Sequence, residues 1–211
     1  MTVLTQLLAD LASGAVDVVD LTSPLWEHTP VIHLPPPFAN TKRFSRTVVS
    51  RYDERGPAWF WHDLELGEHV GTHFDAPIHW ITGRDGLDVA SIPLRHLIAP
   101  AVVIDKRAEC AQNPDFLLEV DHVEAWQREH GPLPEGGWLL FRTGWSERAQ
   151  DGAAFSNRDA QGSHTPGVSV ACARWLAQQT PIVGIGVETV GTDAGMAARF
   201  DPPFPVHHYF L

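Results

Sequence analysis

Three histidines and one aspartate lie within eleven residues of this chain: His69, His73, Asp75 and His79. All four have odd numbers, so a strand-like segment would turn their side chains to one face. Imidazole nitrogens and a carboxylate oxygen together suit a divalent transition metal. A lone His or Asp is usually a surface or hydrogen-bonded core residue, but four such groups this close together predict a metal site.

A fully extended strand would not bring these groups to one ion. His69 and His73 would lie roughly 13 Å apart at about 3.3 Å per residue, whereas ligand bonds are about 2.1 Å long. Gly71 lies between them and can bend the backbone without a steric penalty. We therefore expect a turn followed by a short strand. A helix is disfavoured because Pro77 would break it, and Glu68 precedes the first His, unlike the helical zincin pattern.

The segment His69-x-Gly-Thr-His73-x-Asp75-x-Pro-x-His79 resembles the signature of the metal-dependent cyclase hydrolases, a family that includes arylformamidases and isatin hydrolases. The resemblance extends from residues 19–22 to residues 204–207. The sequence around the motif, at residues 52–57, 74–80 and 188–195, is most similar to the isatin hydrolase branch.

The resemblance implies that His69, His73 and Asp75 hold one divalent metal and that His79 is the catalytic base. This ligand set is compatible with Mn, Zn or Fe; the isatin branch favours Mn, with Zn as the alternative. Water bound to such an ion has a pKa near 7, and His79 can take its proton and pass it to a leaving nitrogen. The implied reaction opens a cyclic amide, isatin to isatinate. The alternatives are an arylformamidase acting on N-formylkynurenine and a non-catalytic metal- or ligand-binding domain.

Tryptophans flank the motif on both sides, and they either pack in the core or form a flat pocket for a small aromatic amide. Trp59, Trp61 and Trp80 are the expected substrate contacts. The family brings a His towards the substrate at the position of His207, which the resemblance therefore adds to this set.

A second metal is not expected. In the two-metal formamidases of the family, a His near His164 and a Glu in the following helix complete a second site, but no Asp or Glu occurs here from Ser163 to Pro181. Glu188 and Asp193 follow a predicted strand, where loop carboxylates either reach a site or cap turns.

Composition limits the remaining classes. A net charge of −11 argues against binding to nucleic acid or an anionic membrane, because both need clusters of Lys and Arg. Only Cys110 and Cys172 occur, which favours a reducing, cytoplasmic location. No signal peptide is expected at the first residues, and no apolar run approaches a membrane span. The resemblance implies a homodimer.

The chain is expected to be one domain over residues 1–211, from which a C-terminal segment found in relatives is missing. Antiparallel strands predicted in the first half and strand–helix alternation in the second half indicate an α/β fold; the resemblance implies a swivelling β/β/α domain with a mixed sheet. A capping box is expected at Asp121 and Glu124. The expected helices cover 3–12, about 121–131 and 169–179, and the expected strands cover 16–21, 42–52, 58–65, 101–105, 138–142 and 182–187, with a loop over 23–40.

Overall fold

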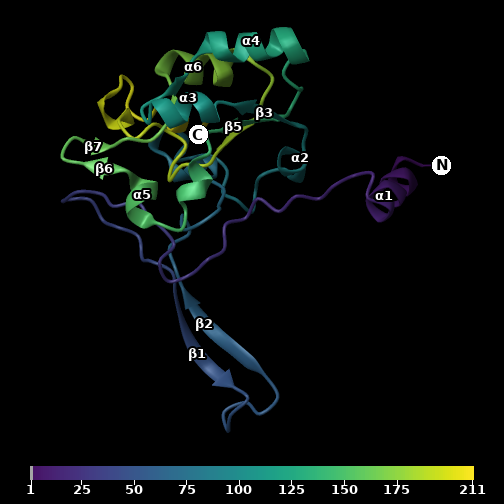
Figure 1. The fold of residues 1–211 in the computed structure, drawn as a ribbon, viewed down its shortest axis with the longest axis vertical. Helices are drawn as coiled ribbons and strands as arrows, with labels where there is room; N and C mark the ends of the chain where they lie inside the picture. Colours follow the sequence, from purple (N-terminus) through teal and green to yellow (C-terminus); the bar gives the residue numbers. More distant parts are fainter. Residues whose placement is uncertain (1) are drawn as a thin grey trace.

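The structure is a computed structural model that describes residues 2–211. A parallel sheet lies at the centre of its main body, in the order β3 (Ala101–Asp105), β5 (Trp138–Arg142) and β9 (Gly184–Val187) (Figure 1). The middle strand pairs with both neighbours, so Leu139 lies opposite Val102 on one side and Ile185 on the other. Parallel strands need crossover connections, and helices supply them here.

Four helices pack with this sheet: α3 (Arg107–Gln112), α4 (Val120–His130), α6 (Val170–Gln179) and α7 (Pro205–Phe210). Helices α4 and α6 contact each other, and α6 also contacts α7 (Figure 1). The core between sheet and helices is apolar and almost free of solvent contact. Its members include Ile104, Cys110, Leu118, Val123, Leu139, Phe141, Cys172, Leu176 and Val206. This core fixes the end of the chain, because α7 is part of it.

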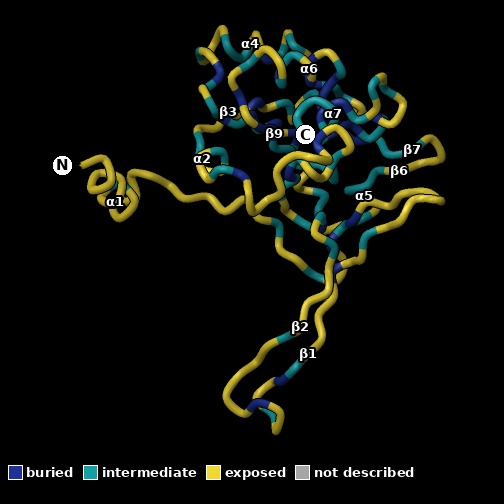
Figure 2. Tube along the Cα trace, turned by 180° about the vertical axis from the view of Figure 1, so that it is seen from behind, coloured by how far each residue is buried: buried dark blue, intermediate teal, exposed yellow. Residues whose placement is uncertain are grey.

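Two parts of the chain project from this body. Strands β1 (Ser45–Arg51) and β2 (Phe60–Glu65) form an antiparallel hairpin whose tip points away from the sheet, and α1 (Val3–Ser13) lies at the end of an extended segment (Figure 1). Both parts are mostly exposed, as Figure 2 shows.

Short elements complete the chain. They are α2 (Leu94–Leu97), α5 (Gly152–Ser156), β4 (Leu117–Leu118), β6 (Arg158–Asp159), β7 (Gly162–Ser163) and β8 (Gly167–Val168), with 3-10 helices at Pro77–His79, Ile81–Gly83, Trp145–Arg148 and Ala197–Arg199. Within residues 2–211, no helix has the length and apolar character that a membrane crossing requires.

The α/β class is confirmed, with parallel and antiparallel strand pairs in separate sheets; the swivelling β/β/α arrangement stays a prediction. The strand expected over 16–21 is wrong, because these residues are extended and exposed without a pairing partner. The capping box at α4 is also not the expected one. Glu119 accepts from the backbone of His122, and the His122 ring binds the backbone N–H of Glu119.

Candidate metal centre and active site

A sharp bend at Gly71 sets the direction of the motif. Gly71 has φ +74°, in the left-handed region that favours glycine. A Cβ at this position would lie 2.5 Å from Leu25 Cδ2. On either side of the bend the chain is anchored: Val70 is buried with Val31 and Phe44, and the Thr72 hydroxyl accepts the Ser23 backbone N–H at 2.9 Å. The predicted role of glycine as the bend is confirmed.

The bend also fixes one imidazole. The Gly71 carbonyl lies 2.8 Å from His73 Nδ1, and because a carbonyl only accepts, this nitrogen carries the proton. When the ring is neutral, Nε2 is therefore the nitrogen with the lone pair, and it lies 3.2 Å from Asp75 Oδ1. Such fixing of the ring by its second nitrogen is typical of metal-binding histidines.

The short strand expected after the bend is wrong. Residues 72–76 form no strand, and His79 ends the 3-10 helix Pro77–His79. Pro77 occupies the first position of this helix, where its fixed φ is favourable and its missing N–H costs nothing. The helical turn carries His79 back towards His69, and their ring centroids lie 4.0 Å apart.

The three motif histidines lie around Asp75. His69 Nδ1 lies 2.6 Å from Asp75 Oδ1, and ligand atoms of His69, Asp75 and His79 all fall within 4.8 Å of one another. Asp75 Oδ1 is shielded from solvent and accepts no hydrogen bond, since the nearby ring nitrogens approach it without hydrogen-bond geometry. A buried carboxylate oxygen without a donor is costly, and a cation would satisfy it. His69, Asp75 and His79 therefore fit a divalent metal; His73 is not in this set, although its Nε2 lies 3.2 Å from Asp75 Oδ1.

The groups around Asp75 also favour the ionised form of its carboxylate. Burial alone would raise the pKa of Asp75, but the neighbouring His73, His69 and His79 outweigh it and lower the pKa to about 2. Burial, together with the adjacent His69, lowers the pKa of His79. Asp75 is therefore ionised and His79 tends to be neutral at pH 7, as a ligand and a base require.

The C-terminal helix α7 completes one side of the centre. Gly83 lies so close to this helix that a Cβ would meet the Leu211 carbonyl at 2.6 Å. This contact places His207 Nε2 3.9 Å from Asp75 Oδ2, with its ring centroid 4.6 Å from that of Trp80. Trp80 also meets the Phe204 ring edge-on. Trp80 and His207 thus lie beside the motif, where substrate contacts were expected.

Trp59 and Trp61 do not lie there. Trp61 is in β2 and Trp59 precedes it near the tip of the hairpin, which points away from the motif of the same chain (Figure 1). Each is about half exposed.

Other residues named from the sequence belong to separate clusters. The two ring nitrogens of His164 face Asp115 at 2.7 Å and Asp159 at 3.2 Å, carboxylates that the sequence did not indicate as partners. The Glu188 carboxylate accepts hydrogen bonds from Thr143 and Gly144 N–H and from the Ser146 hydroxyl, and so joins the ends of β9 and β5.

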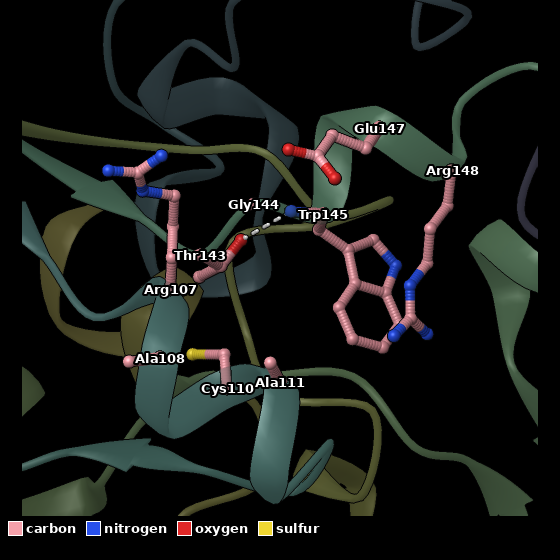
Figure 3. A pocket seen from close by; sticks show the side chains of 9 residues that line it. All are labelled: Arg107, Ala108, Cys110, Ala111, Thr143, Gly144, Trp145, Glu147 and Arg148. Carbon is pink, nitrogen blue, oxygen red and sulfur yellow. Dashed lines mark hydrogen bonds between the residues drawn. The ribbon is translucent and has the colours of Figure 1, made fainter.

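A cavity of about 320 Å³ lies elsewhere, beyond the ends of β3 and β5 (Figure 3). No motif residue lines it. Arg107 on its wall is paired with Asp105, and the Arg148 guanidinium covers the Trp145 ring at 3.8 Å. Both arginines of its wall are thus engaged with protein groups.

Comparison with known proteins identifies the family of this chain. The model of the family described as "Putative cyclase" matches residues 19–194, which include the whole motif. The chain belongs to the cyclase family. Within this family it is 47% identical to the isatin hydrolase of Roseibium aggregatum, over 97% of this chain and 79% of that relative.

Two solved cyclase-family structures show the same fold. Isatin hydrolase A from Ralstonia solanacearum superposes with a TM-score of 0.95 at 46% identity, covering 99% of this chain and 80% of that one. An isatin hydrolase bound to the product analogue thioisatinate gives a TM-score of 0.95 at 46% identity, with 99% and 81% covered.

Two features of the centre were missed from the sequence. Phe204 adds an aromatic ring beside Trp80, and Asp193 bonds His207. Asp193 was noted only as a loop carboxylate, and its distance from His207 in the sequence gave no sign of the pairing.

Proposed function

We propose that this protein hydrolyses isatin to isatinate with one divalent metal ion. The observation that carries the proposal is that the three motif histidines lie around the Asp75 carboxylate, one oxygen of which has no hydrogen-bond donor. The similarity to isatin hydrolases over nearly the whole chain supports the choice of substrate.

His69, His73 and Asp75 are the proposed ligands, and Mn is the favoured ion with Zn as the alternative. When bound, such an ion activates water and stabilises the negative charge that develops on a carbonyl oxygen. Asp75 offers the unsatisfied oxygen, and His73 offers Nε2 because Nδ1 is tied to the Gly71 carbonyl.

His79 is the proposed base. Its ring lies over His69 and faces His207 at a centroid distance of 5.7 Å, so it stands beside the ligands and at the edge of the aromatic wall. It removes a proton from the attacking water, the carbonyl carbon gains the new C–O bond, and the ring C–N bond breaks. The proton on His79 then goes to the departing nitrogen, which leaves His79 neutral again.

An aromatic wall supports a planar substrate. Trp80, Phe204 and His207 form this wall next to His79. A flat bicyclic lactam gains stacking contacts there, whereas a flexible formyl group gains fewer.

The test is a comparison of kcat/KM for isatin and N-formylkynurenine on one Mn-loaded sample. We expect isatin to react faster. The opposite order would favour an arylformamidase, and turnover of neither compound would favour a ligand-binding domain. His79→Ala, which should retain metal, is the control for turnover by contaminating enzymes.

We also propose that the protein acts in the cytoplasm as a homodimer. The hairpin exposes large apolar side chains on both strands, with Val48 40%, Trp61 55% and Leu64 60% exposed. A surface of this kind favours a protein partner, and a second copy would give Trp59 and Trp61 an apolar environment. Light scattering should give twice the mass of one chain, and Leu64→Lys should lower it. A monomer at micromolar concentration would refute the dimer.

A further inference from the structure

The Asp193 carboxylate, which holds the site residue His207, is buried and hydrogen-bonded through both of its oxygens. Oδ1 accepts the Val206 backbone N–H at 2.7 Å. Oδ2 accepts the His207 backbone N–H at 3.2 Å and lies 2.5 Å from His207 Nδ1. The side chain is only 3% exposed. One buried carboxylate thus holds both the backbone and the ring of His207.

These bonds fix which ring nitrogen carries a proton. Both Asp193 oxygens already accept backbone N–H groups, so the short contact to the ring requires a proton on His207 Nδ1. The Thr192 hydroxyl lies 3.2 Å from the same nitrogen. His207 Nε2 is therefore the nitrogen that is free of the loop, and it points towards Asp75 Oδ2 at 3.9 Å.

The surroundings leave the His207 ring little freedom. Trp80 stacks beside it, His79 faces it, and its side chain is 12% exposed. A ring held at one nitrogen and packed at its face keeps its other nitrogen at a fixed place.

We infer that Asp193 is a positioning residue for ring opening: it acts through His207, whose Nε2 it directs at the substrate's amide group. This inference rests on the proposed function. No bond of Asp193 changes during the reaction, because its contribution is the orientation of the imidazole.

A purely structural role for Asp193, as a cap of α7, is the competing explanation. Asp151 provides a matched control, because its carboxylate accepts the Ala153 and Ala154 N–H groups at the start of α5 at 2.9 and 3.1 Å and bonds no imidazole. Asp151→Asn should lower the melting temperature and leave kcat and KM within about twofold of the parent.

Asp193→Asn replaces one acceptor oxygen by an N–H donor, so the side chain can no longer accept both backbone N–H groups and the ring N–H, and it no longer favours a proton on His207 Nδ1. We expect kcat to fall about 10–100-fold, the range for lost orienting partners, with KM changed less than threefold. His207→Gln should cause a similar loss. The double variant should be no more than about threefold worse than His207→Gln, because Asp193 then has no ring to orient. If the loss of kcat in the double variant equals the product of the two single losses, the inference is wrong.

Nitrogen-15 spectra of the histidine rings test the orientation without turnover. In zinc-loaded wild-type protein, His207 should carry a proton on Nδ1, with His207→Gln identifying its signals and Asp193→Asn shifting them. An unprotonated Nδ1 in the wild type would overturn the inference even if Asp193→Asn fails to fold. Because this measurement needs no substrate, it separates failure of the inference from failure of the isatin assignment.

Discussion

Replacing Gly71 by Ala should weaken metal binding more than it weakens the fold. Gly71 has φ +74°, and a residue with a Cβ pays about 1–2 kcal/mol in this region. The new methyl would also meet Leu25 Cδ2 at 2.5 Å, but Leu25 is 41% exposed and its side chain can rotate away. The backbone cost therefore dominates. If the motif relaxes to escape it, metal affinity falls by a factor of about 5–30.

Gly14 is a matched control for this change. It has the same φ of +74°, ends α1 far from the motif, and has open space around its Cβ position. Gly14→Ala pays a similar backbone cost without touching the ligands. Competition with a chelator gives the metal dissociation constants, and thermal melting gives the stabilities. We expect weaker metal binding only in Gly71→Ala. An affinity within twofold of the parent would refute the idea that this bend positions the ligands.

Further changes test the other assignments. His79→Ala should retain metal by elemental analysis and lose about 10²–10⁴-fold in turnover; loss of metal would make His79 a ligand instead. The double variant His73→Ala, Asp75→Ala should bind no metal, and retained binding would exclude both as ligands. His164→Ala should leave about one equivalent per chain, whereas anomalous scattering from two ions would contradict a single site. Burial alone would raise the pKa of Glu188, but its hydrogen bonds outweigh burial and lower the pKa below the ordinary 4.5. These bonds therefore stabilise the fold fully above pH 4.5, and their contribution is lost as the pH falls through the lowered pKa. Glu188→Gln should therefore melt earlier than the parent at pH 7, by a margin in melting temperature that narrows as the pH falls below the ordinary 4.5; a constant margin would contradict this.

The sequence predicted features that depend on short-range rules. The bend at Gly71 follows from the ligand spacing and from the freedom of glycine. Helix α6 begins where Ser169 caps it, since the Ser169 hydroxyl accepts the Cys172 N–H. The α/β class follows from strand–helix alternation in the second half of the chain. Each of these depends on residues close together in the chain.

The errors come from features that depend on distant residues. Residues 16–21 have the composition of a strand, but no neighbouring strand pairs with them. Trp61 is eight residues from His69, yet β2 is extended at about 3.3 Å per residue and carries it away from the motif. His207 meets Asp193 only because α7 packs on α6 and against Gly83. Sequence proximity to the motif was therefore a poor guide to the aromatic wall.

Two imidazoles of the centre are held in the same manner by unrelated parts of the chain. His73 Nδ1 is tied to the Gly71 carbonyl and His207 Nδ1 to the Asp193 carboxylate, which leaves both Nε2 atoms facing Asp75. Among residues 2–211, Asp75 Oδ1 is the buried side-chain atom left without a hydrogen bond, at a cost of about 1–3 kcal/mol. The Nδ1 atoms of His73 and His207 thus have hydrogen-bond partners, whereas the Asp75 oxygen between the motif histidines has none. A cation that binds Asp75 Oδ1 finds the ligand His73 and the neighbouring His207 already oriented, because the bonds at their Nδ1 atoms do not involve the ion.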